Sequence, residues 1–435
     1  MMIAALCAAA SGCTKEQPPA KSTGQASAQL DSISEPYVKL VLAVGKHDAD
    51  YVDAYYGPPE WRPEGDTTKI PLADIATQAQ SLVERLDSIA KPDDEMLSLR
   101  RSYLRTQLSA LATRVSMLEG KKLTFDEESK ALYDAVAPTH PESYFQQIID
   151  SLGAMLPGTG TVAQRLDTYR NRFVIPSAKL DTVFKTAIGE CKARTLKHIT
   201  LPPGEEFKLE YVKDKSWSGY NWYQGNFKSL IQVNTDLPIY IERAVDLACH
   251  EGYPGHHVYN ALLEQNLVKQ RGWLEYTVYP LFSPQSLIAE GSANYGVDMA
   301  FPGQERVEYE RRALWPLAGL DPAEAEKYYR IQELANRLGY AGNEAARRYL
   351  DGGMNATQAA AWMVQYALSS PPRAKQRMRF VDQYRSYVIN YNLGKDIVRE
   401  YTERVGGTDT TKRWEAFTGI LTSPRLPGDL TGASK

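Results

Sequence analysis

Cysteine is scarce in this sequence, and its spacing suits neither of its common structural uses. The 435 residues include only four cysteines, at Cys7, Cys13, Cys191 and Cys249. The absence of any Cys-x-x-Cys pair argues against a thiolate zinc site. The four residues are also too few and too scattered for a disulfide scaffold. We therefore expect Cys249 to be a small, buried thiol.

A surplus of positive charge is missing as well. The chain has 50 basic and 53 acidic residues, for a formal net charge of -3. This balance excludes the basic footprint of a nucleic-acid-binding protein, so we expect no nucleic-acid partner. The composition, with 43% hydrophobic and 24% charged residues, is that of a globular protein long enough to bury a large core.

The apolar run at the N-terminus is too short to cross a membrane as a helix. Residues 1–10 are apolar, and small residues then lead to Cys13. This pattern resembles the signal of bacterial lipoproteins, which implies a signal over 1–13 and lipidation of Cys13. Such a protein belongs to the bacterial cell envelope, on the periplasmic side of a membrane or at the cell surface. The alternative is a disordered apolar tail.

The remainder of the chain predicts a tether followed by one large helical domain. Residues 14–34 contain almost no large apolar side chain and predict a flexible tether. Residues 35–430 predict a single mainly α domain, in which 35–200 can form an N-terminal helical subdomain. The ranges with helical periodicity include 71–91, 94–118, 178–199, 284–300 and 371–404. Short strands at 207–212 and 227–234 predict a small β-sheet or hairpin beside the helix that carries the motif described next.

Three of the six histidines fall within eight residues, from His250 to His257. Two imidazoles one helical turn apart, with a glutamate beside the first, form the usual zinc motif of hydrolases. Here the position one turn after His250 is Pro254, which cannot bind metal, so the second ligand must be His256 or His257. On an unbroken helix His257 would lie about 10 Å along the axis from His250. A bend at Pro254-Gly255 favours His256, with His257 as the alternative second ligand or a substrate contact.

The same stretch resembles the His-Glu-x-x-Pro-Gly-His-His signature of the bacterial domain-of-unknown-function 885 family. That group is zincin-like and rich in secreted lipoproteins, and it pairs the motif with a downstream Glu-Gly, matched here by Glu290-Gly291. The family usually has tryptophan where this chain has Ser292. A late Tyr-x-x-Gly is matched at Tyr391 to Gly394, with Arg348-Tyr349 upstream. The resemblance covers roughly residues 35–405 and implies a gluzincin-type helical fold.

In this resemblance Glu290 is the third ligand of one Zn²⁺ ion. The residues around it predict a helix with a small residue beside the carboxylate. Two histidines and one carboxylate leave a zinc position open for water, as in catalytic sites. Glu251 is then the expected general base, which takes a proton from that water and passes it to the leaving amine.

Further candidate residues would contact the substrate. A developing oxyanion needs a donor besides the metal, and Tyr391 is the first candidate, with Tyr387 and Arg348 as alternatives. The strand that contains Gln232 and Asn234 could pair with an extended peptide if it lies at a sheet edge. It could equally be a structural strand.

The sequence therefore predicts a zinc-dependent hydrolase of the metallopeptidase kind, acting on a peptide or small amide. The alternative is a membrane-tethered binding protein with a structural or degenerate metal site. The presence of Glu251 favours the enzyme, because a purely structural site has no need of a base.

Overall fold

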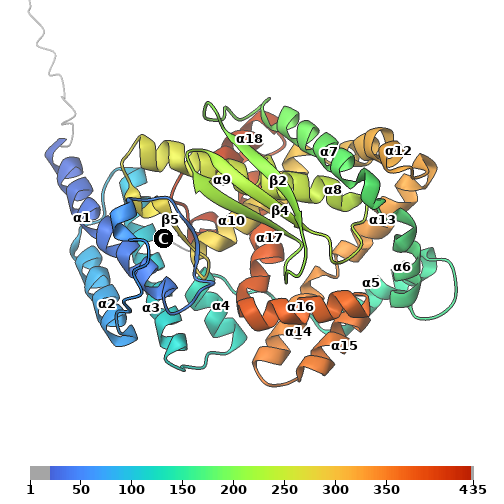
Figure 1. The fold of residues 1–435 in the computed structure, drawn as a ribbon, viewed down its shortest axis with the longest axis horizontal. Coiled ribbons are helices and arrows are strands. Elements are labelled where there is room, and N and C mark those ends of the chain that lie inside the picture. Colours follow the sequence, from blue (N-terminus) through green and yellow to red (C-terminus); the bar gives the residue numbers. More distant parts are fainter. Residues whose placement is uncertain (1–19, 433–435) are drawn as a thin grey trace, which may run out of the picture.

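Helices make up most of the computed structural model, which describes residues 20–432 and their side chains from residue 24 onward (Figure 1). The helices of the N-terminal half are α1 (Ala20–Gly45), α2 (Leu72–Ser88), α3 (Glu95–Leu118), α4 (Phe125–Tyr133), α5 (Glu142–Met155), α6 (Val162–Arg170) and α7 (Leu180–Thr195). These bounds confirm the predicted helices at 71–91, 94–118 and 178–199 to within a few residues.

Helices also fill the second half. They are α8 (Glu242–Leu247), α9 (His256–Leu263), α10 (Pro284–Ala300), α11 (Gln304–Tyr309), α12 (Trp315–Ala318), α13 (Ala325–Asn336), α14 (Gly339–Leu350), α15 (Ala356–Tyr366), α16 (Pro371–Tyr384), α17 (Ile389–Gly406), α18 (Thr410–Leu421) and α19 (Pro427–Thr431). Two shorter helical segments matter for the site, the π-helical turn η4 (Ala248–Gly252) and the 3₁₀ turn η9 (Arg385–Val388). The mainly helical fold class is thus confirmed.

Helix α1 corrects the prediction of a flexible tether over 14–34 for the part that the structure describes, residues 20–34. The helix begins at Ala20, and both Leu30 and Ile33 are buried. Their spacing continues the apolar face that the sequence shows from Tyr37 onward, so the helix gains packing and stays ordered. Asp31 also pairs with the buried Arg100 at 2.6 Å. Cys13 and the predicted signal lie outside the described residues.

A three-stranded sheet stands beside the motif helix. Its strands are β2 (Glu206–Val212), β3 (Gly219–Gly225) and β4 (Lys228–Asn234), in the order β2-β4-β3. Strand β4 runs parallel to β2 and antiparallel to β3. The sequence predicted strands that match β2 and β4 but none that matches β3. Asn221 and Tyr223 are buried while Trp222 is exposed, so those side chains alternate between the two faces. A smaller sheet pairs β1 (Val52–Tyr55) with β5 (Val278–Pro280).

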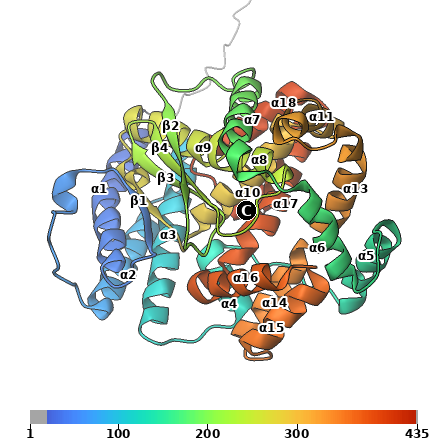
Figure 2. The same cartoon turned by 45° about the vertical axis from the view of Figure 1, so that its right-hand side comes forward.

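Helices α10 and α17 lie at the centre of the molecule in both views (Figures 1 and 2). Nearly every side chain of α10 is buried, as expected of a helix covered on all sides. The two helices touch backbone to backbone: a Cβ atom placed on Gly291 would lie only 2.4 Å from the carbonyl oxygen of Gly394. Glycine at both positions therefore allows α17 to pack directly against the helix that carries Glu290.

The range 371–404, predicted as one helix, is broken. Helix α16 ends at Tyr384, and Arg385 has a φ of 53°, which cannot continue a right-handed helix. The buried Glu128 holds this break, accepting bonds from Arg385 Nε and from the Ser386 hydroxyl, both at 2.7 Å. The periodicity on each side is helical, so only this long-range contact reveals the turn.

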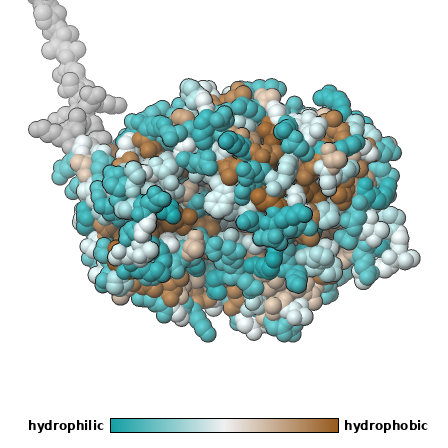
Figure 3. Space-filling view, viewed as in Figure 1, coloured by the Kyte–Doolittle hydropathy of each residue, from teal (hydrophilic) through white to brown (hydrophobic). Residues whose placement is uncertain are grey.

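Within residues 20–432, no helix combines the length and the apolar character needed to cross a membrane. On the face shown in Figure 3 hydrophilic side chains predominate, and hydrophobic ones occur in groups between them.

Candidate metal centre

The motif bends where the sequence predicts a bend, and the bend brings two histidines together. His250 lies on the wide turn η4, and His256 is the first residue of α9. Their Nε2 atoms are 3.1 Å apart, with the rings nearly perpendicular at 89°. Gly255 makes this path possible, because a Cβ there would lie 1.8 Å from the carbonyl oxygen of His250. His256, not His257, thus stands beside His250.

Glu290 of α10 completes the cluster. Its Oε2 atom lies 3.2 Å from Nε2 of His250 and 3.7 Å from Nε2 of His256. The other oxygen, Oε1, accepts a 2.8 Å hydrogen bond from the hydroxyl of Tyr387. Oε2 is buried and, among the described residues, no donor is aligned for a hydrogen bond to it, so it can bind a metal. The predicted set of His250, His256 and Glu290 is therefore a mostly buried group that could hold an ion.

These distances fit a zinc ion. Ligand atoms about 2.0–2.1 Å from a tetrahedral centre lie about 3.3 Å from one another. The three separations in the cluster range from 3.1 to 3.7 Å. Two imidazole nitrogens and one carboxylate oxygen also match the donor set that zinc prefers in catalytic sites.

The cluster attracts positive charge. Burial alone would raise the pKa of Glu290, but His256 and His250 outweigh burial and hold this pKa below its usual value. Burial would conversely lower the pKa of His256, yet the Glu290 carboxylate raises it to about 9. A divalent cation can replace the proton that this arrangement favours, because a ligand histidine must be neutral.

Glu251 follows His250, and its carboxylate lines a cavity of about 1050 Å³ beside the cluster. Among the described residues it has no hydrogen-bond or ion-pair partner. Gly219 of β3 leaves room for it, since a Cβ there would lie 2.6 Å from Oε1 of Glu251. Asn221 of the same strand donates a 2.7 Å bond to the backbone oxygen of Glu251. Burial raises the pKa of this carboxyl, and His250 and His256 partly oppose the rise.

Two tyrosines approach the cluster from one wall of the cavity. Tyr387, on the turn η9, contacts Glu290 directly. Tyr391, one turn later on α17, also lines the cavity, and its hydroxyl has no hydrogen bond within the described residues. Burial and the charge of Glu290 raise the pKa of Tyr391, so its phenol stays protonated and can donate. The two tyrosines are therefore placed for different roles.

His257 is turned away from the cluster, which corrects its prediction as a second ligand or substrate contact. Its side chain is fully buried, with Nε2 2.9 Å from Glu205 and Nδ1 2.9 Å from Ser229. A carboxylate only accepts, so Nε2 carries a proton towards Glu205. Adjacent side chains on a helix point about 100° apart, so His257 points elsewhere when His256 of α9 points towards His250 and Glu290.

Three other residues predicted to contact the substrate, Arg348, Gln232 and Asn234, lie outside the cavity lining. Arg348 lies over the ring of Trp362 at 4.0 Å and pairs with Glu142 at 3.3 Å, away from the cavity. Gln232 bonds to Trp222 on the exposed face of the sheet, and Asn234 holds the backbone oxygens of Lys215 and Trp217. Their strand, β4, is the central one, so it has no free edge for a peptide.

Sequence reasoning also missed residues that line the cavity. Asp53 of β1 accepts a hydrogen bond from the hydroxyl of Tyr220, which follows Gly219 on β3. Burial raises the pKa of Asp53 to about 6, although that hydrogen bond opposes the rise. The aromatic residues around Tyr220 are a signal that could have drawn attention to that segment, but no local pattern indicates Asp53 or Arg377.

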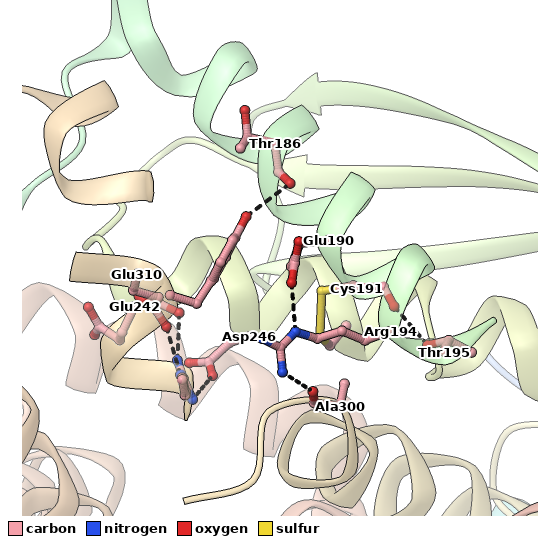
Figure 4. Close-up of a disulfide and its surroundings, with 12 residues drawn as sticks. Thr186, Glu190, Cys191, Arg194, Thr195, Glu242, Asp246, Ala300 and Glu310 are labelled. Atoms are coloured by element: carbon pink, nitrogen blue, oxygen red, sulfur yellow. Dashed lines mark hydrogen bonds and ion pairs between the residues drawn. A yellow bond between two sulfur atoms is a disulfide. The ribbon is translucent and has the colours of Figure 1, made fainter. Parts of the chain in front are cut away.

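A disulfide joins Cys249 to Cys191, contrary to the expectation of a free thiol (Figure 4). The bond links α7 to η4, one residue before His250. Figure 4 shows Glu190 and Arg194 of α7 beside it, joined by a 2.8 Å ion pair. The two cysteines are 58 positions apart, so the sequence does not reveal the pairing, but the link anchors the metal motif to the neighbouring helix.

The fold is similar to solved structures of bacterial proteins. One is described as a "putative lipoprotein" from Colwellia psychrerythraea, with a TM-score of 0.53 and 16% identity over 82% of this chain and 65% of that chain. Another, a "putative lipoprotein of unknown function" from Shewanella oneidensis, has a TM-score of 0.45 and 16% identity over 82% and 71%. The chain thus spans 65% of the length of the Colwellia protein. No protein-family model and no curated protein matches the sequence.

Proposed function

We propose that this protein is a zinc-dependent hydrolase that cleaves peptide or related amide bonds. The observation that carries the proposal is the position of Glu251. Its carboxylate, which has no partner in the described part of the chain, lines the same cavity as His250, His256 and Glu290. A structural metal site needs ligands only, whereas hydrolysis also needs a base beside the attacking water.

Each side chain then has a distinct task. A zinc ion held by His250, His256 and Glu290 would polarise the substrate carbonyl and make a bound water more acidic. Glu251 accepts the proton of the attacking water and returns it to the nitrogen of the leaving amine, so that the amide bond breaks to a carboxylic acid and an amine. The raised pKa of Glu251 suits a group that must both take and release a proton.

Tyr391 and strand β3 extend this proposal to the substrate. The Tyr391 phenol would donate a hydrogen bond to the oxyanion that develops on the carbonyl. Strand β3, not β4, lies at the edge of the sheet, and its Gly219 and Tyr220 line the cavity. An extended peptide could pair with this edge, because backbone pairing recognises peptides of varied sequence.

The sequence motif and the Glu-Gly pair support membership of the domain-of-unknown-function 885 family with a gluzincin-type ligand set. The small residues before Cys13 support a lipoprotein anchored in the bacterial cell envelope. The Colwellia neighbour in the same fold is also described as a "putative lipoprotein".

Metal analysis and peptide profiling test the proposal. The purified protein should contain one zinc ion and cleave members of a peptide library, as followed by mass spectrometry. Glu251→Gln should keep the zinc and lose cleavage by at least about 100-fold, the usual size of a general-base contribution. Glu326→Gln is the matched control, because this glutamate on α13 is exposed and forms no ion pair with any residue from 20 to 432. Bound zinc without Glu251-dependent cleavage would favour the binding protein instead.

A further inference from the structure

Within residues 20–432, one half-buried arginine of the cavity lining makes neither a hydrogen bond nor an ion pair. Arg377 of α16 lines the cavity, and among the described residues its guanidinium has no hydrogen bond and no carboxylate partner. Most other basic side chains of the lining do face a carboxylate, in the pairs Arg170–Glu242, Arg243–Asp246, Arg306–Asp246, Lys395–Asp298 and Arg399–Asp396. Among the described residues Arg337 and Arg373 also lack a carboxylate partner, but Arg337 is exposed and Arg373 donates a hydrogen bond to a backbone oxygen.

Aromatic rings hold the Arg377 guanidinium near the proposed catalytic groups. Its central carbon lies 4.8 Å from the ring centre of Phe380 and 5.5 Å from that of Tyr391. Such contacts stabilise the cation over the ring face but use none of its N–H donors. The planar fork of donors therefore stays available for an anion. Burial also lowers the pKa of Arg377, which reflects the cost of desolvating a charge that has no partner.

A second arginine adds positive charge one turn away. Arg373 also lines the cavity and lies on the same face of α16, about 6 Å along the helix from Arg377. It donates a 2.6 Å bond to the backbone oxygen of Pro238, and its guanidinium packs over the ring of Tyr240. The wall formed by α16 is thus positive, while Glu251 and Glu290 lie on segments η4 and α10.

We propose that Arg377 binds a carboxylate of the substrate, so that the enzyme selects peptides with a negative charge near the cleaved bond. A guanidinium binds a carboxylate through two parallel hydrogen bonds, which also fixes its orientation. The carboxylate can be the free C-terminus of the peptide or the side chain of an aspartate or glutamate. This inference rests on the proposed hydrolase function, because it assigns a substrate class to the same cavity.

Peptide binding tests the inference separately from catalysis. Zinc-loaded Glu251→Gln protein is titrated calorimetrically with three short peptides that share one neutral backbone sequence. The first has a free C-terminus, the second is its C-terminal amide, and the third is the amide with one glutamate side chain. At least one carboxylate peptide should bind about tenfold or more tightly than the neutral amide, as expected for a charged hydrogen-bonded pair. Which of the two does so identifies the source of the carboxylate.

The arginine is then removed in the same background. Adding Arg377→Gln should bring the affinities for the carboxylate peptide and the neutral amide to within about twofold of each other. Arg377→Lys should retain only part of the wild-type difference between these two affinities. Arg379→Gln, an exposed arginine on the same helix outside the cavity lining, is the control and should keep the full preference. Equal binding of all three peptides, or a preference that survives Arg377→Gln, overturns the inference. If the wild-type enzyme still cleaved the neutral, amidated peptide, the proposed hydrolase function would stand without the role of Arg377. Carboxylate-selective binding without cleavage of any peptide would instead refute the hydrolase function and leave the role of Arg377 in binding intact.

Discussion

The hydroxyl of Tyr387 donates a 2.8 Å hydrogen bond to Oε1 of Glu290, on the far side of the carboxylate from the two histidines. This bond fixes the orientation of the third ligand and leaves Oε2 directed at His250 and His256. Tyr391, one turn later, makes no such contact with the carboxylate. We therefore expect substitution of Tyr387 to affect zinc binding and substitution of Tyr391 to affect turnover.

Removing each hydroxyl separately tests this distinction. Tyr387→Phe should weaken zinc binding by about 10- to 100-fold, the range for partners that orient a ligand. Tyr391→Phe should leave zinc affinity unchanged and lower turnover by about 100-fold, as for loss of an oxyanion donor. Zinc affinity is measured by competition with a chromophoric chelator, and turnover with the best peptide from the library. Equal zinc affinity in wild type and Tyr387→Phe would contradict the orienting role.

Zinc should stabilise the fold through its three ligands. An ion that binds only the folded state at a hundredfold excess over its Kd adds about 2.7 kcal/mol to the free energy of unfolding. Thermal unfolding with and without zinc should therefore show a higher Tm for the metal-loaded protein. His256→Ala should abolish this difference, because it removes a ligand from the cluster. His47→Ala, which alters an imidazole bonded to the backbone oxygen of Ile70 and outside the cluster, should retain it.

The close contact between α10 and α17 predicts that any side chain at position 291 lowers the free energy of unfolding. Gly291→Ala would push a methyl group into the backbone of Gly394, and such overpacking costs about 1–3 kcal/mol. Urea denaturation should show this loss, together with weaker zinc binding from the displaced Glu290. Gly189→Ala in the interior of α7 is the control, since a Cβ there meets nothing within 4 Å. It should be neutral or stabilising by up to about 1 kcal/mol.

The bonds to Glu205 predict a loss of stability in acid. Burial alone would raise the pKa of this carboxyl, but bonds from His257, Lys192 and Tyr253 lower it from 4.5 to about 2. A carboxyl with a lowered pKa stabilises the fold fully above the unfolded value, and the benefit declines as pH falls from about 4.5 towards 2. Glu205→Gln should thus be clearly less stable than wild type at pH 7.

The difference in the free energy of unfolding between wild type and Glu205→Gln should become smaller as pH falls below about 4.5. Urea denaturation in the presence of a chelator, at several pH values, measures it without any contribution from bound metal. Glu210→Gln, an exposed glutamate on β2, serves as the matched substitution. A wild-type advantage that stays constant from pH 7 to pH 3 would show that ionised Glu205 does not contribute as described.

Local patterns in the sequence were sufficient for most helices and for the core of the site. The range 284–300 was predicted as a helix and coincides with α10, because apolar periodicity reflects a preference of nearby residues. The bend that selects His256 over His257 was also readable, since Pro254 and Gly255 act on their own backbone. Glu290 lies much further along the chain, and its place in the cluster was expected from the family resemblance together with its helical surroundings.

Contacts between distant segments decided everything else. The break at Arg385 depends on Glu128, and the position of Tyr387 depends on that break. Which helix faces pack together likewise decides three other features. They are the disulfide, the lack of an ion pair at Arg377, and the orientation of Arg348 away from the cavity. A helix presents every side chain once in about 3.6 residues, so its own sequence identifies an apolar face but not the partner that covers it. The sequence by itself thus determined the elements and the ligand types, whereas tertiary packing decided which side chains share the cavity.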